Sequence, residues 1–369
     1  MLVAFRTDAS IQIGTGHVMR CLTLAEELTR HGHKCWFICR EHHGHLGSLI
    51  KSKSYGLTLL PGGSGDDSYL ENDHAENYAL WLGVPWLEDA GQTLNALSSL
   101  NPDWLVVDHY ALDEKWEKTV LPKSTRLMVI DDLADRPHRA DLLLDQNLGR
   151  DVMDYAGLVP ASCRVLVGPH FALLRPEFSA LRVASLARRR QQPQFKQLLI
   201  SLGGVDKDNV TGQVLSALRA CDLPSTLNIV VVMGATSPWL DDVKARAADI
   251  NCQVEVVVNV TDMAQRMANA DLAIGAAGIT TWERCCLGLP AMMVVLAQNQ
   301  WPIAQALAKT GGAVCLGTSD RIHELTTKLT AISSKVVLHE ISMEAEAVTD
   351  GEGAKRLVEF IEENKTGTL

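Results

Sequence analysis

The stretch FRTDASIQIGTGHVMRCLTLAEEL, residues 5–28, joins a short apolar strand, Leu2 to Phe5, to a helix through a turn that contains Gly14 and Gly16. Backbone amides in a glycine turn between a strand and a helix can approach a phosphate or a sugar closely. His17 opens the helix, where the positive end of the helix dipole disfavours an imidazolium. We therefore expect His17 to stay neutral and to be either a catalytic base or a helix cap.

Short apolar runs alternate with helical segments along the chain, and they fall into two sets. The first set of predicted strands covers residues 2–5, 34–39, 105–108, 127–130 and 142–144. The second covers residues 198–204, 228–234, 253–260, 271–278 and 291–297. Runs that are apolar throughout are typical of parallel strands buried on both faces. The sequence therefore predicts an α/β protein with two doubly wound, Rossmann-like domains and a ligand in a central cleft.

A polar, basic segment separates the two sets and carries prolines near both ends, so we interpret it as the connection between domains. The predicted boundaries are an N-terminal domain over residues 1–175, a linker over 176–197 and a C-terminal nucleotide-binding domain over 198–369. The helix expected near residues 354–363 is predicted to pack back across the cleft.

The composition limits the partners of the protein. The chain has 369 residues and a net charge of −10 at pH 7, which repels polyanions, so we expect no nucleic-acid partner. No apolar run approaches the about 18 residues of a membrane-spanning helix, and Arg6 interrupts the first apolar run. We therefore expect a cytoplasmic protein with no membrane partner, and we take a monomer as the default.

The histidines and cysteines do not form a metal-binding pattern. His42, His43 and His45 lie close together, but in a glycine-containing loop that does not fix them as ligands. None of the nine cysteines lies in a CxxC pair. We therefore expect no metal ion.

A glycine pair in the second set of strands predicts a ligand loop. Gly203 and Gly204 follow a strand and precede a helix that begins near Asn209. Free amides at the start of a helix attract a phosphate. Glycine is also common in ordinary turns, so this motif is not specific by itself.

The segment GAAGITTWERCCLGLP repeats this geometry further along the chain. Gly278 follows a strand, Thr280 can cap the next helix or donate to a phosphate, and Glu283 lies in the first helical turn. A carboxylate there either accepts hydrogen bonds from the cis-diol of a ribose or only complements the helix dipole. Asn299, with Gln298 and Gln300, follows the last predicted strand and is expected to meet sugar or phosphate. The two strand–glycine–helix units together predict a bound nucleotide, although neither a GxGxxG motif nor a P-loop is present.

Polar residues also gather where strands of the first set end. Asp108, His109 and Tyr110 follow a buried strand, and Arg6 and Asp8 point towards the same edge, where functional residues of such sheets gather. The same edge includes a group of which several members could be structural ion pairs or caps: Asp131, Asp132, Asp135, Arg136 and His138.

Several motifs, taken in order, carry a family resemblance. They are RTDASIQIGTGHVMRCLTLAEEL, WLVVDHYALDEKWE, DDLADRPHRADLLLDQN, GPHFALLRPEF, ISLGGVDKDN and GAAGITTWERCCLGLP. The series resembles the UDP-2,4-diacetamido-2,4,6-trideoxy-β-L-altropyranose hydrolases of pseudaminic acid biosynthesis, over residues 2–363.

This resemblance implies a GT-B-like fold and release of UDP from a UDP-sugar by water, with inversion at the anomeric carbon and without a metal or other cofactor. It implies that His17 handles the attacking water, that Gly203 and Gly204 hold the diphosphate, and that Glu283 holds the ribose. The candidate substrate-binding residues are Arg6, Asp8, Gly14, Gly16, Asp108, Tyr110, Gly203, Gly204, Gly278, Thr280, Glu283 and Asn299.

Three other functions remain open on the sequence. The first is a GT-B glycosyltransferase with a UDP-sugar donor, since one fold serves both reactions. Its membrane-facing patch would be apolar or basic, whereas the loop over residues 69–90 is aromatic but acidic, which favours hydrolysis. The others are a non-catalytic sensor of nucleotide sugars and a UDP-sugar 2-epimerase.

Overall fold

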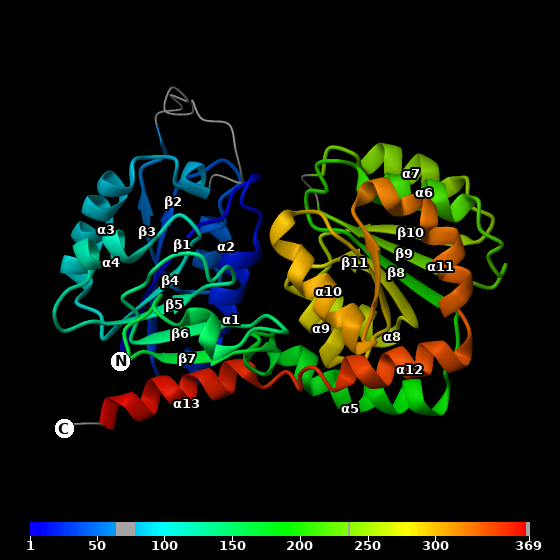
Figure 1. Ribbon diagram of the computed structural model, residues 1–369. Coiled ribbons are helices and arrows are strands. Elements are labelled where there is room, and N and C mark those ends of the chain that lie inside the picture. Colours follow the sequence, from blue (N-terminus) through cyan, green and yellow to red (C-terminus); the bar gives the residue numbers. More distant parts are fainter. Residues whose placement is uncertain (64–77, 235–236, 367–369) are drawn as a thin grey trace. The chain divides into compact units, whose positions relative to one another are not determined.

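The computed structural model describes residues 1–63, 78–234 and 237–366, so part of the acidic loop, residues 69–77, lies outside the described residues. The chain divides into two compact units (Figure 1). The first contains Met1–Leu173 together with the segment from Ala354 onward, and the second contains Leu174–Gly353. Within the described residues, no helix has both the length and the apolar character needed to cross a membrane.

The first unit is built on a seven-stranded parallel sheet with the strand order β3-β2-β1-β4-β5-β6-β7. Its strands are β1 (Leu2–Thr7), β2 (Lys34–Arg40), β3 (Gly56–Leu60), β4 (Trp104–Asp108), β5 (Arg126–Ile130), β6 (Leu142–Asp145) and β7 (Arg164–Val167). Its helices are α1 (Gly16–Arg30), α2 (Gly47–Ser52), α3 (Trp86–Leu100), α4 (Glu114–Val120) and α13 (Gly353–Thr366), with 3-10 turns η2 (Tyr78–Leu82), η3 (Val152–Tyr155) and η4 (Pro169–Phe171).

Alternate residues of the central strands enter two separate cores in this unit. In β1, Val3 and Phe5 join a core with residues of α1 and α13, while Ala4 joins a core with residues of α3 and α4. Successive side chains of a strand point to opposite faces, so a strand covered on both sides must be apolar throughout. This is why the sequence of β1 lacks the polar alternation of a half-exposed strand.

The second unit has a six-stranded parallel sheet with the order β10-β9-β8-β11-β12-β13. Its strands are β8 (Gln197–Ser201), β9 (Asn228–Met233), β10 (Gln253–Val258), β11 (Leu272–Ala276), β12 (Ala291–Val294) and β13 (Val314–Gly317). Its helices are α5 (Pro176–Gln191), α6 (Val210–Arg219), α7 (Leu240–Ala248), α8 (Met263–Asn269), α9 (Thr280–Cys286), α10 (Trp301–Thr310), α11 (Leu325–Ile332) and α12 (Lys335–Glu346), with 3-10 turns η5 (Gln298–Gln300) and η6 (Ser319–Glu324).

Both sheets reverse their strand order at one place. The reversal lies between β1 and β4 in the first unit and between β8 and β11 in the second. Open parallel sheets bind ligands outside the carboxyl ends of the strands at such a reversal, because the two connecting loops separate there. The topology therefore points to the loops after β1 and β4, and to those after β8 and β11, as binding positions.

The predicted fold class of two doubly wound α/β domains is confirmed, but three strands were missed. These are β3, β7 and β13, and each lies at an edge of its sheet. β7 begins with the exposed Arg164, and β13 ends in a glycine. Edge strands are buried less than central ones, so their sequences carry a weaker apolar signal.

The segment predicted as a linker is instead a helix of the second unit. α5 packs against α8, α9 and α12. Arg189 on α5 is buried and donates to the carbonyls of Met267, Ala270 and Leu287, at 2.8, 2.7 and 3.0 Å. Carbonyls at the end of a helix lack partners within it, and arginine can satisfy them. The basic composition of this segment suggested a solvated connection. Its Arg189 instead forms hydrogen bonds with carbonyls at the C-terminal ends of α8 and α9.

The predicted boundary at residue 198 is also wrong for the end of the chain, because α13 belongs to the first unit. Leu357, Val358 and Ile361 are fully buried in the core that contains β1 and α1. His31 and His33, in the turn after α1, lie 3.2 and 2.8 Å from carboxylate oxygens of Glu362. The first unit is thus made from two separate stretches of chain.

Replacement of Leu357 by alanine tests this assignment of α13. Loss of a fully buried leucine costs about 2 to 5 kcal/mol, so Leu357→Ala is expected to destabilise the first unit. Hydrogen exchange followed by peptide should rise in β1 and α1 and stay unchanged in β8 and β9. Glu359→Ala, on the exposed face of the same helix, is the matched control. Faster exchange confined to the second unit would contradict the assignment.

Candidate functional site

The site of the first unit lies where β1 and β4 end. Thr7 and Asp108 are partners in the parallel register of these strands, so Asp8 and Asp108 lie at adjacent strand ends. The turn after β1 is closed by Ser10, whose hydroxyl accepts from the amide of Ile13 at 2.9 Å. Gly14 has a φ of +80°, which side chains rarely adopt, and so allows the chain to turn directly into α1. His17 therefore lies on the first turn of α1, beside the end of β4.

His17 is held by Asp108. Its Nδ1 lies 2.6 Å from Oδ1 of Asp108, and its side chain is 10% exposed. An ionised carboxylate can only accept, so at this distance Nδ1 carries the ring proton. In the neutral ring the lone pair is then on Nε2, which has no hydrogen-bond partner among the described residues. Sequence reasoning identified Asp108 only as a candidate substrate-binding residue at this sheet edge, and its contact with Nδ1 shows that it orients the ring of His17.

Arg20 keeps Asp108 ionised. Its Nε and Nη2 donate to the two oxygens of Asp108 at 2.6 and 2.7 Å. Burial opposes the ionisation of Asp108, but the charge of Arg20, with hydrogen bonds from Arg20 and His17, holds the pKa of this carboxyl well below its usual range. Arg20 also donates to Asp132 at 2.6 Å. A single guanidinium thus joins two carboxylates behind His17.

Aromatic rings line one side of His17. The ring centroid of Tyr110 lies 4.7 Å from that of His17, edge to face, and Trp81 stacks on Tyr110 at 5.5 Å. The hydroxyl of Tyr110 donates to Asp132 at 2.8 Å. Burial, with the neighbouring charge of Asp132, raises the pKa of Tyr110, so the phenol remains protonated. Tyr110 therefore presents its ring, rather than a free hydroxyl, towards His17.

Arg6 and Asp8 lie behind this site and have no exposed surface. Nη1 of Arg6 lies 2.6 Å from Asp8, and its Nη2 lies 2.6 Å from Asp89. Arg40 also contacts Asp89 at 2.5 Å and donates its amide to Asp8 at 2.7 Å. The structure therefore corrects the predicted contact of Arg6 and Asp8 with substrate, because both side chains are fully buried and their ion pairs fix the ends of β1 and β2.

His109 is also turned into this buried network. Its Nδ1 accepts from the amide of Ala111 at 3.1 Å, and its Nε2 lies 3.5 Å from Asp8. Burial lowers the pKa of His109 to about 3, so the ring is neutral. Among the described residues, no three His, Cys, Asp or Glu side chains are grouped so that they could hold a metal ion.

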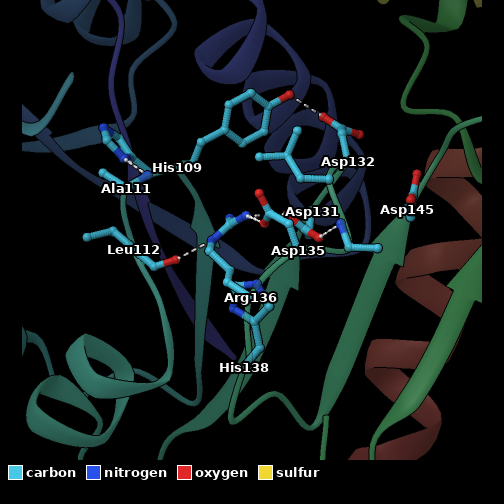
Figure 2. Close-up of polar contacts among 12 residues, drawn as sticks. His109, Ala111, Leu112, Asp131, Asp132, Asp135, Arg136, His138 and Asp145 are labelled. Atoms are coloured by element: carbon cyan, nitrogen blue, oxygen red, sulfur yellow. Dashed lines mark hydrogen bonds and ion pairs between the residues drawn. The ribbon is translucent and has the colours of Figure 1, made fainter. Parts of the chain in front are cut away.

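The segment that follows β5 is mostly structural (Figure 2). Arg136 contacts Asp131 at 2.9 Å and donates to the carbonyl of Leu112 at 2.9 Å. His138 lies 2.6 Å from Glu117. Of this segment, Asp132 reaches the His17 site through Arg20 and Tyr110, and the guanidinium of Arg136 lies 6.0 Å from the centroid of the Tyr110 ring.

In the second unit, Gly203 and Gly204 follow β8 and are exposed. Gly203 has a φ of +102°, and a Cβ there would meet open space, so glycine is required by the backbone rather than by packing. The helix α6 that follows is already capped. Asp206 accepts from the amides of Val210 and Thr211 at 2.9 and 2.8 Å, and these donors are not free for a phosphate. The start of α6 therefore does not offer these amides to an anion, and the glycine turn remains as the candidate anion site.

Asn209 completes the cap of α6. It lies one residue before the helix and accepts from the amide of Gly212 at 3.1 Å. Its own φ of +51° is one that asparagine tolerates better than most residues. A third amide of the first helical turn is thus also occupied.

Glu283 lies in α9, after β11, and its side chain is 12% exposed. Burial raises the pKa of Glu283, although the charge of Arg175, whose Nη2 lies 3.3 Å from Oε1, opposes the shift. Thr280 accepts from Arg284 at 3.3 Å, and Gly278 and Asn299 are half-buried. The Oδ1 atom of Asn299 is buried without a hydrogen-bond partner. Glu283, Thr280 and Asn299 thus retain hydrogen-bonding capacity.

Two residues of the first site, Arg20 and Trp81, were missed by sequence reasoning, whereas Asp132 was expected at this edge but not as a partner of Arg20. Arg20 follows His17 by three residues on a helix, and this spacing places both side chains on one face. This spacing could therefore have predicted that Arg20 lies beside His17. No local sequence pattern predicted the position of Trp81, because the fold of η2 brings it to His17.

The two sheets, each with its loops at a strand-order reversal, define a GT-B-like protein. Residues 198–359 match the Glycosyltransferase family 28 C-terminal domain. The chain is similar to the UDP-2,4-diacetamido-2,4,6-trideoxy-beta-L-altropyranose hydrolase of Campylobacter jejuni subsp. jejuni serotype O:2, being 26% identical over 312 residues that cover 84% of this chain and 97% of that protein. The resemblance predicted from the sequence motifs is thereby confirmed.

Two further comparisons differ in what they cover. The chain is 25% identical over 304 residues to the uncharacterized protein MJ1062 of Methanocaldococcus jannaschii, which is 81% of this chain but 56% of that protein. The structure is similar to MurG of Acinetobacter baumannii with a TM-score of 0.69 and 18% identity, covering 98% of this chain and 99% of that one. At this identity the likeness establishes the fold alone.

The position of the proton on His17 is a direct test of the site geometry. ¹⁵N chemical shifts of the neutral ring are expected to report a proton on Nδ1 in the native protein and a loss of this preference in Asp108→Ala. Asp132→Asn leaves the contact between Asp108 and His17 in place and should retain the Nδ1 proton. A native ring with its proton on Nε2 would refute the arrangement.

Proposed function

We propose that the protein hydrolyses UDP-2,4-diacetamido-2,4,6-trideoxy-β-L-altropyranose to UDP and 2,4-diacetamido-2,4,6-trideoxy-L-altrose, a step of pseudaminic acid biosynthesis, with His17 as the general base. The observation that carries the proposal is the state of His17: Nδ1 donates to an ionised carboxylate, and none of the residues that the structure describes bonds to Nε2. A base in this state can take a proton from water. The similarity to the Campylobacter hydrolase over 84% of the chain supports the choice of substrate.

Water is the only co-reactant that this hydrolysis needs. The water oxygen attacks the anomeric carbon as Nε2 of His17 takes one of its protons, and the bond from that carbon to the diphosphate oxygen breaks. UDP leaves with the bonding electron pair, and one attack from the opposite side inverts the anomeric centre. Asp108 remains ionised and stabilises the imidazolium that forms, as a carboxylate does for the histidine of a hydrolase triad.

The second unit is proposed to hold UDP. The exposed amides of the turn at Gly203 and Gly204 would bind the diphosphate and stabilise the charge that develops on the leaving group. Glu283 would accept hydrogen bonds from the ribose hydroxyls. Gly278, Thr280 and Asn299 remain candidates for contacts with the nucleotide sugar.

A glycosyltransferase with a UDP-sugar donor is the second candidate function. The match of residues 198–359 to a glycosyltransferase family domain favours it. The two candidates differ in the acceptor, since a transferase needs a hydroxyl compound in place of water.

Turnover without an acceptor distinguishes these functions. The purified protein is expected to release UDP and the free sugar from the proposed substrate in the presence of EDTA, as followed by NMR. His17→Asn should lower kcat by about 10²- to 10⁴-fold, because it removes the base. His43→Asn, which changes an exposed loop histidine, is the control and should keep full activity.

Other outcomes would favour a different function or refute the role of His17. Tight binding without release would favour a transferase or a sensor, and a product with changed configuration at C2 would favour an epimerase. Near-normal turnover of a folded His17→Asn protein would refute the role of His17.

The role of Glu283 is tested by UDP binding alone. Glu283→Gln is expected to weaken UDP binding by about 10- to 100-fold in calorimetry, because a hydrogen bond to a charged group is worth roughly 1.5 to 3 kcal/mol. Glu340→Gln, at an exposed position of α12, should bind UDP like the native protein. Equal affinities for all three proteins would remove Glu283 from the nucleotide site.

A further inference from the structure

Three aromatic residues form a continuous wall beside His17, which we call the aromatic wall: Tyr78, Trp81 and Tyr110. Trp81 stacks on Tyr110 with an angle of 28° between the rings, and Tyr78 lies edge-on to both, with centroid distances of 4.9 Å. Trp81 also lies edge-on to His17, at 6.1 Å. The wall therefore adjoins the ring to which we assign the proton transfer.

The wall is fixed in place from behind. The hydroxyl of Tyr110 is held by Asp132, which Arg20 also binds, so the ring of Tyr110 cannot turn away without breaking this network. Trp81 is carried on η2, and the next residue, Leu82, is 2% exposed and belongs to the core that contains α3 and α4. The rings of Tyr110 and Trp81 are thus supported by separate parts of the first unit.

The wall offers ligands mainly ring faces. The hydroxyl of Tyr110 is already used, while Trp81 is only half-buried and its indole Nε1 has no hydrogen-bond partner among the described residues. A sugar hydroxyl on the ring faces, out of reach of the indole N–H, would lose its water without gaining a partner, and this costs free energy. Methyl groups and C–H surfaces bear no such cost, and an amide carbonyl could accept from the indole N–H.

We propose that Trp81 determines the sugar specificity of the site, because the aromatic wall accepts the methyl-bearing parts of a 6-deoxy, N-acylated sugar and disfavours hydroxyl groups at the same positions. This inference rests on the proposed function, since it takes the sugar to be bound next to His17. Trp81 is a specificity residue here and takes no part in the transfer of the proton.

The first test compares two substrates. One is the proposed 6-deoxy substrate, and the other is the same UDP-sugar with a hydroxyl on C6. Wild-type protein should prefer the deoxysugar in kcat/KM, and Trp81→Ala should reduce this preference by about 10- to 100-fold, the range in which an apolar pocket discriminates. The change should appear in KM, with kcat nearly unaltered. Trp81→Phe, which keeps a ring face, should retain most of the preference.

Two controls separate specificity from stability. Trp86→Ala removes a tryptophan that is 43% exposed on α3 and should leave both substrates unaffected. UDP affinity should be unchanged in Trp81→Ala. If Trp81→Ala weakens both substrates equally, or weakens neither, the inference is overturned.

A binding measurement keeps the inference separate from the proposed function. In saturation-transfer NMR with the free sugar 2,4-diacetamido-2,4,6-trideoxy-L-altrose, the C6 and acetyl methyl protons should receive the strongest transfer from wild-type protein, and Trp81→Ala should lose it. If this pattern is seen but the UDP-sugar is not hydrolysed, the proposed function fails and the inference stands. Unchanged methyl signals in Trp81→Ala, or none in the wild type, overturn the inference even if His17 proves essential.

Discussion

The ion pair between Arg20 and Asp108 determines what the site of the first unit can do. Both side chains are buried, and charges removed from water are tolerated only when their hydrogen bonds are made within the protein. Asp108 meets this condition because each of its oxygens accepts from Arg20, and one also accepts from His17. This pair orients His17 through Asp108. Arg20 also binds Asp132, which in turn accepts from the hydroxyl of Tyr110 and so fixes the position of that ring.

The two units place different kinds of residues at the same topological position. Each places its candidate residues where the strand order of a parallel sheet reverses. The first unit fills this position with buried arginines and carboxylates, which fix side chains rigidly. The second leaves an exposed glycine turn and satisfies the start of α6 with its own Asp206 and Asn209. The first arrangement suits proton transfer, and the second suits close approach of a ligand to the backbone.

The sequence predicted the central strands and His17 because both depend on local patterns, an apolar run and a glycine turn before a helix. It failed where the outcome depends on packing between distant segments. Arg6 and Asp8 resemble surface ligands in sequence, yet Asp89 and Arg40 bury them. The basic α5 resembles a linker because the carbonyls that Arg189 satisfies lie about 80 to 100 residues further along the chain. No local signal marks Trp81 as a neighbour of His17.

The return of α13 to the first unit has a consequence for how the protein is made. Residues 174–353 interrupt the first unit in the chain, so a ribosome completes the whole second unit before it supplies Leu357, Val358 and Ile361. Domains generally fold as units during synthesis, beginning with the N-terminal one. Here the order is reversed: the second unit can close while the earlier segment still lacks part of its interior. The apolar surface of β1 and α1 that packs against α13 in the finished protein is still uncovered at that point of synthesis.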